Sequence, residues 1–245
     1  DLDAMLPTMH GFDEFFGSLY HLNAEEEPED PDYPKDPAFR AKYAPRGVLH
    51  TWAQPGGTQR IENTGPLTKK RMETIDEEFE AAAVKFIRQA HKDGKPFFVV
   101  IWFGSPHEPY SGLPADLALY DDLPAKYAEK KVSLTSNETG GQTRRAQGEV
   151  LRERYAEITA MDRAIGQLRQ HLAATGSRDN TLLFYCGDNG TSGDASLASP
   201  HRGAKGQVYE GGVLVPGLIE WPARIPRSRV TQVRATTSDL LPTLC

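Results

Sequence analysis

Two short runs of apolar residues constrain the fold of this chain most strongly. The first covers residues 96–103 and the second residues 181–186. Neither run alternates apolar with polar residues, and β-branched or aromatic side chains are common in both. Such runs are typical of strands that are covered on both faces, as in a parallel sheet. We therefore predict that both runs form buried strands.

Helical patterns precede each of the two runs. Apolar residues recur every three or four positions over 72–90 and again over 151–172, which is the spacing of an amphipathic helix. Gly94 and Gly176 follow these stretches, as glycines commonly do at helix ends. The order of helix, strand, loop, helix and strand predicts an α/β fold with a mainly parallel sheet sandwiched by helices.

The overall composition argues against several classes of protein. Lys and Arg number 28 against 34 Asp and Glu, which gives a net charge of −6 and no basic surface for nucleic acid. No apolar run reaches the roughly 18 residues of a membrane span. The two cysteines, Cys186 and Cys245, form neither a disulfide framework nor a zinc motif. No feature of the sequence indicates an oligomeric state.

The second apolar run ends in an acid and an amide. Asp188 and Asn189 stand between Gly187 and Gly190, and one interpretation is a plain turn, because these residue types are common in turns. The alternative is a metal site, because ligands bind at the carboxyl ends of parallel strands. A carboxylate and an amide oxygen suit calcium or magnesium better than zinc.

Two further polar groups favour a functional site over a turn. His107 follows the first run between Pro106 and Pro109. A lone histidine in a loop is usually an ordinary surface residue, but the ends of parallel strands share one edge of the sheet. Lys205, in the glycine-rich stretch 200–216, is a compact cation suited to an anionic oxygen, and glycines allow close approach to a ligand. Together these groups predict a metal-assisted site for an anionic ester.

Five short motifs carry a family resemblance when they are taken in order. They are HGFD at 10–13, PHEPY at 106–110, DNG at 188–190, RGAK at 202–205 and YEGG at 209–212. With them the chain resembles the type I, formylglycine-dependent sulfatases of the alkaline phosphatase-like superfamily over nearly its whole length. The opening segment, through residues 19–28, resembles bacterial arylsulfatases in particular.

The resemblance implies a role for each matched residue. Asp188 and Asn189 correspond to two calcium ligands, with calcium favoured over magnesium. Lys205 corresponds to the lysine that contacts the sulfate and stabilises charge near the leaving oxygen. His107 corresponds to the histidine at the sulfate, a candidate proton donor to the leaving alcohol. Arg202 is expected to have a structural role.

The resemblance also implies the wider biology of the protein. The reaction would be hydrolysis of a sulfate monoester to an alcohol and sulfate, and the partner a small-molecule or carbohydrate sulfate ester. Export to the periplasm or the medium is expected. Loops 20–66 and 111–147 are expected to wall the active site, because loops on a rigid sheet carry specificity.

One family feature is missing from the sequence. The nucleophile of the family is a formylglycine made from Cys or Ser in a C/S-x-P-x-R motif, and residues 1–245 contain no such motif. We therefore expect these residues to be the central and C-terminal part of a catalytic domain that is incomplete at both ends. The nucleophile segment would precede them and a small C-terminal subdomain would follow. The fragment alone is expected to be inactive.

Two alternative functions stay open at this point. The chain could belong to a phosphate or phosphonate monoester hydrolase of the same superfamily, because the same ligands and lysine suit either anion. It could also belong to a non-catalytic relative that binds a sulfated glycan. The nucleophile position would discriminate between these alternatives.

Overall fold

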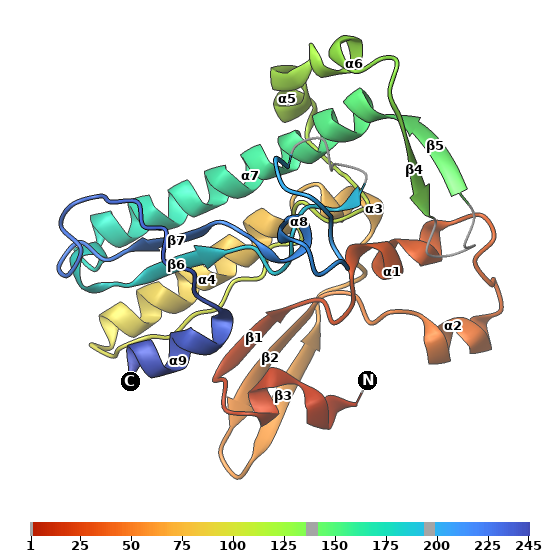
Figure 1. Ribbon diagram of the computed structural model, residues 1–245. Coiled ribbons are helices and arrows are strands. Elements are labelled where there is room, and N and C mark those ends of the chain that lie inside the picture. The colour runs from red at the N-terminus through yellow and green to blue at the C-terminus, as the bar shows by residue number, and fades with distance from the viewer. Residues whose placement is uncertain (1, 136–141, 194–198) are drawn as a thin grey trace.

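Two long helices organise the molecule (Figure 1). The computed structural model describes residues 2–135, 142–193 and 199–245. Helix α4 (Ile75–Lys92) and helix α7 (Gln147–Ala174) contact each other, and Arg88 of α4 donates to Nδ1 of His171 on α7. The helices predicted from apolar spacing are therefore confirmed, and α7 is longer at both ends than predicted.

Positive-φ glycines follow both long helices. Gly94 adopts φ +65° after α4 and Gly176 adopts φ +72° after α7, a conformation that favours glycine over other residues. The shorter helices are α1 (Leu22–Glu26), α2 (Pro37–Tyr43), α3 (Lys69–Met72), α5 (Pro114–Leu117), α6 (Leu123–Lys126), α8 (Glu210–Val213) and α9 (Leu240–Leu244). Among the described residues, none of the helices is both long enough and apolar enough to cross a membrane.

The strands form three small sheets. Strands β1 (Glu14–Gly17), β2 (Leu49–Gln54) and β3 (Thr58–Asn63) make an antiparallel sheet in that order. Strand β4 (Lys131–Thr135) pairs antiparallel with β5 (Gln142–Ala146), and β6 (Leu183–Cys186) pairs antiparallel with β7 (Gly217–Glu220).

The α/β class and the strand at 181–186 are confirmed, but the predicted parallel pairing is not found. Every strand pair within the described residues is antiparallel. Residues 96–103, predicted as a buried strand, form no strand there. Phe98 and Trp102 of this segment are 71% and 77% exposed, whereas Phe97, Val99 and their alternate neighbours are half-buried. An apolar run cannot reveal which of its faces is covered, and here only one is packed by described residues.

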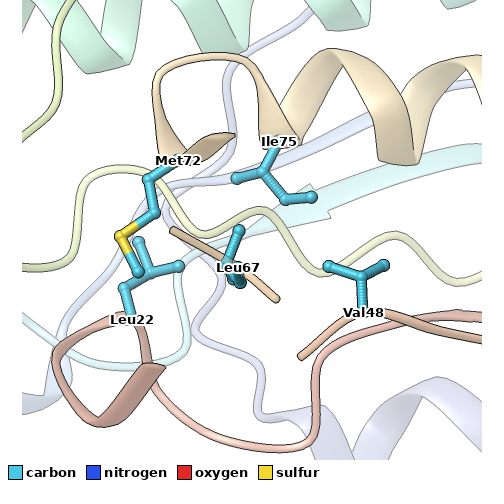
Figure 2. Packing of buried hydrophobic residues seen from close by; sticks show 5 residues of the cluster. All are labelled: Leu22, Val48, Leu67, Met72 and Ile75. Atoms are coloured by element: carbon cyan, nitrogen blue, oxygen red, sulfur yellow. The ribbon is translucent and has the colours of Figure 1, made fainter. Parts of the chain in front are cut away.

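A compact apolar cluster joins the N-terminal elements to α4 (Figure 2). Leu22, Val48, Leu67, Met72 and Ile75 are each at most 9% exposed and pack together. Burial of side chains of this kind stabilises a fold by roughly 1.5–3 kcal/mol each. The cluster fixes α1 against the start of α4, and both of these elements contact the loop that carries His107.

Candidate functional site

Three loops bring the predicted site residues together. They are the loop at 104–112, the loop at 187–192 after β6, and the glycine-rich loop at 199–209 before α8. Lys205 Nζ lies 3.5 Å from His107 Nε2. The backbone N–H of Lys205 donates to the carbonyl of Thr191 at 2.8 Å, two residues after Asn189. His107, Lys205 and the Asp188–Asn189 turn therefore share one region of the molecule, as predicted.

The ring of His107 has a defined orientation. Its Nδ1 lies 2.8 Å from the carbonyl oxygen of Glu108, which can only accept, so Nδ1 carries a proton. Nε2 is then the atom that faces Lys205. With the proton on Nδ1, Nε2 can accept from the Lys205 ammonium, so the two groups stand side by side where the oxygens of one anion could reach both.

A second imidazole stacks on His107 and was missed by sequence reasoning. The ring centroids of His21 and His107 are 4.9 Å apart, with an angle of 20° between the planes. His21 directly precedes α1 and is exposed. The contact limits how far the His107 ring can tilt. Its only signal in the sequence was the resemblance of the segment around His21 to bacterial arylsulfatases.

Glycines bring two of the site loops into backbone contact. The N–H of Gly190 donates to the carbonyl of Gly212 at 2.9 Å. A Cβ atom on Gly190 would lie 2.1 Å from the oxygen of Gly211, and one on Gly211 would lie 2.2 Å from the oxygen of Gly203. No side chain fits at these distances. These contacts bring the loop after β6 and the glycine-rich loop against the backbone of α8. The close approach to a ligand that the glycine-rich stretch suggests stays a prediction.

Arg202 contacts its own loop. Its guanidinium lies 4.0 Å from the centroid of the Tyr209 ring and donates to the Tyr209 hydroxyl at 3.0 Å. Its backbone carbonyl also accepts from the N–H of Gly211 at 2.8 Å. These contacts fit the structural role expected of Arg202, because they hold the loop that presents Lys205.

Helix α7 contributes an arginine that links two site loops. Nη1 of Arg154 donates to the hydroxyl of Tyr110 at 3.3 Å and to Oγ of Ser192. Tyr110 belongs to the loop of His107, and Ser192 belongs to the loop that follows Asn189. This side chain was not singled out in the sequence because arginines are common on exposed helix faces.

The predicted metal ligands form an incomplete set among the described residues. Asp188 is exposed and Asn189 is half-buried, and both immediately follow β6. Their oxygens suit a hard cation such as calcium, which takes 6–8 oxygen ligands. The described ranges contain no group of three or more His, Cys, Asp or Glu side chains that could hold a metal. The two residues fit part of a calcium shell and need further ligands.

A surface groove of about 560 Å³ lies elsewhere, between α4 and α7. Its lining residues are Glu80, Ala81, Val84, Lys85, Arg88, Gln89, Lys92, Gln167 and His171. The lining includes neither His107 nor Lys205. The groove is therefore separate from the predicted site.

The chain matches known proteins along its length. The family model for Sulfatase matches residues 3–245. Mouse arylsulfatase G is 25% identical over 97% of this chain and 43% of its own length, and mouse N-acetylgalactosamine-6-sulfatase is 25% identical over 97% of this chain and 38% of its own length. This chain therefore spans less than half the length of these curated relatives.

A solved structure supports the fold. The crystal structure of the PsFucS1 sulfatase from Pseudoalteromonas sp. superposes with a TM-score of 0.62 at 26% identity, over 90% of this chain and 40% of that one. The expected alkaline phosphatase-like sulfatase fold is thereby confirmed. With the family match over residues 3–245, it follows that the chain belongs to the sulfatase family.

Proposed function

We propose that the full protein hydrolyses a sulfate monoester to an alcohol and inorganic sulfate. The observation that carries the proposal is the 3.5 Å approach of Lys205 Nζ to His107 Nε2 in a chain of the sulfatase family. An ammonium group and an imidazole that face each other can both donate to the oxygens of one bound anion. Because the chain covers less than half of its relatives, the activity is proposed for the whole protein.

Lys205 and His107 would act on the oxygens of the ester. As the bond between sulfur and the leaving oxygen breaks, negative charge develops on that oxygen, and Lys205 would stabilise it electrostatically. His107, when protonated at Nε2, would donate that proton to the leaving alcohol. The bond from Nδ1 to the Glu108 carbonyl would keep Nε2 directed at the substrate.

Asp188 and Asn189 would hold a calcium ion, in preference to magnesium, together with ligands from outside the described residues. When bound, the ion would neutralise charge on the sulfate oxygens. We also expect that the nucleophile, a formylglycine, lies elsewhere in the full protein, because residues 1–245 contain no C/S-x-P-x-R motif.

The proposed substrate is a small aryl or carbohydrate sulfate. One relative, mouse N-acetylgalactosamine-6-sulfatase, is named for a sulfated sugar, and another, mouse arylsulfatase G, is named for aryl sulfates. The proposed location is the periplasm or the medium. Cell fractionation of the native host would test the location independently of the activity.

The test is sulfate release by the full-length protein, with and without calcium. Aryl sulfates and sulfated sugars would be compared with the matching phosphate and phosphonate esters. Faster cleavage of the phosphate or phosphonate ester would overturn the proposal in favour of the related hydrolase. Binding of a sulfated glycan without sulfate release would favour a non-catalytic relative. Asp188→Ala should raise the calcium concentration needed for half-maximal rate, and excess calcium should partly restore activity.

A further inference from the structure

Two buried carboxylates hold the two ends of the loop that carries His107. Asp76, in the first turn of α4, accepts the backbone N–H groups of Gly104 at 2.7 Å and Ser105 at 3.1 Å. Glu157, in the first half of α7, accepts the backbone N–H of Ser111 at 2.6 Å. The two acids are 5% and 6% exposed.

The loop also packs tightly at both ends. A Cβ atom on Gly104 would lie 3.0 Å from Cδ1 of Leu22 in α1. A Cβ atom on Gly112 would lie 2.9 Å from the Cβ of Ala156, the neighbour of Glu157 in α7. The same two points of the loop are thus fixed by apolar contact and by a carboxylate.

Burial of these acids is unfavourable unless something compensates for it. A carboxylate that leaves water loses strong hydration, and it usually gains a cationic partner or takes up a proton. Within the described ranges neither Asp76 nor Glu157 forms an ion pair, and their hydrogen bonds come from the loop backbone. We propose that Asp76 and Glu157 are positioning residues, which fix the loop so that His107 lies opposite Lys205. This inference rests on the proposed function for its catalytic consequence only.

The charge on Glu157 adds a pH dependence to this role. Burial raises the pKa of Glu157 to about 8, and the negative charges of Asp76 on α4 and Glu153 on α7 add to the rise. The Ser111 N–H and the positive charge of Arg154 oppose it. Oε2 of Glu157 is buried and has no hydrogen-bond partner in the part of the chain that the structure describes. At neutral pH Glu157 is therefore mostly protonated, and above about pH 8 its ionisation places a second negative charge near Asp76.

Amide hydrogen exchange in the full-length protein tests the positioning role directly. In Glu157→Leu the Ser111 amide should exchange at least about tenfold faster than in the wild type, because a lost buried hydrogen bond changes the opening equilibrium by roughly this factor. In Asp76→Asn the amides of Gly104 and Ser105 should exchange faster than in the wild type, and the Ser111 amide should not. Asp162→Asn is the matched control on α7, since Asp162 is exposed and is not among the charges that act on Glu157. Unchanged exchange of Ser111 in Glu157→Leu would overturn the proposal.

A second variant keeps the test decisive if Glu157→Leu does not fold. Glu157→Gln retains an acceptor oxygen for Ser111 but cannot ionise. Glu157→Met has nearly the same volume and no acceptor, so its Ser111 amide should exchange at least about tenfold faster than that of Glu157→Gln at pH 7. Equal exchange in these two variants would refute the positioning role.

Kinetics separate this inference from the proposed function. Glu157→Leu should lower kcat more than it raises KM, and most for sulfate esters with poor leaving groups, because those depend on the proton from His107. An equal loss for all leaving groups would contradict the link to His107. If the wild type released no sulfate while the exchange pattern held, the proposed function would fail and the positioning of the loop would stand.

Discussion

The two halves of helix α7 hold acidic side chains in opposite ways. In the first half, Glu157 is buried, accepts one backbone N–H at 2.6 Å and has its pKa raised to about 8 by burial. Near its end, Arg169 donates to Glu220 of β7 at 2.6 Å, and Arg178 donates to the same carboxylate at 2.7 Å. Hydrogen bonds from these arginines lower the pKa of Glu220.

The difference indicates that the pairing near the end of α7 contributes stability, whereas the buried acid in its first half positions a loop of the candidate site. An acid paired with two arginines at the surface is an ordinary, salt-screened interaction. An acid buried against backbone N–H groups costs free energy that the rest of the fold must offset. A fold can retain such a cost where it fixes the position of a loop, and here the fixed loop carries His107.

The largest expected effect is a loss of catalytic rate when Lys205 is replaced, a change that leaves helix α7 untouched. Lys205→Ala in the full-length protein should lower the rate of the chemical step by about 10²–10³-fold, the usual scale for one preorganised charge. Lys85→Ala is the control, because Lys85 lies exposed on α4 and lines the separate groove. Single-turnover measurements would show the effect, and equal rates for both variants would contradict the role of Lys205.

A smaller effect is expected from the backbone contact between the site loops. Gly211→Ala would place a Cβ atom 2.2 Å from a carbonyl oxygen and should destabilise the protein by about 1–3 kcal/mol, as overpacking does. Gly166→Ala in the middle of α7 meets no atom within 4 Å and should stabilise by about 0.5–1 kcal/mol. Denaturant unfolding measures both, and a stable Gly211→Ala would mean that the loops separate easily.

The raised pKa of Glu157 should make the stability of the protein depend on pH. The pKa of Glu157 rises from 4.5 to about 8 on folding, so the folded state retains a proton that the unfolded state releases between these values. Stability should therefore fall as the pH rises through this window, by at most about 1.4 kcal/mol per pH unit. Glu157→Gln should flatten the fall in unfolding experiments from pH 5 to 8. An unchanged slope in the variant would show that another group is responsible.

The smallest effect is expected at Glu220, near the end of α7. There stability should rise with pH, whereas at Glu157 it should fall. The pKa of Glu220 is lowered in the folded state, so its contribution is present above the ordinary pKa of 4.5 and is lost as the pH falls. Solvent screening limits this contribution to at most about 1 kcal/mol. Glu220→Gln should cost about that much at pH 7 in low salt and less in high salt. A loss that persists in high salt would show that Glu220 does more than pair with arginines.

Sequence reasoning succeeded where local pattern determines structure. The apolar spacing over 72–90 and 151–172 predicted both long helices, and the motifs around His107 and Lys205 predicted residues that lie together. It failed on strand pairing, because the run at 96–103 says nothing about which segments lie beside it. The stacking of His21 depends on a contact between segments more than 80 residues apart, and no local pattern encodes that.

The sequence indicates less clearly that Asp76 and Glu157 are buried and contact a loop. Asp76 stands in the first turn of α4, where an acid is common for electrostatic reasons. Glu157 lies four residues before Met161, and both side chains are buried in α7. An acid on the buried face of an amphipathic helix is unusual, and that position could have been singled out from the sequence.

The glycine contact between the loops has a consequence for how such a site can diversify. Gly190, Gly203 and Gly211 meet backbone to backbone, so a substitution at any of them displaces Lys205 or the Asp188–Asn189 turn. Variation that retunes substrate choice must therefore fall on neighbouring positions that bear no such contact. His21 is one of these, since it is exposed and its neighbour on the site side is the ring of His107. Directed evolution aimed at new sulfate esters would be most productive with the glycines held constant and the segment around His21 randomised.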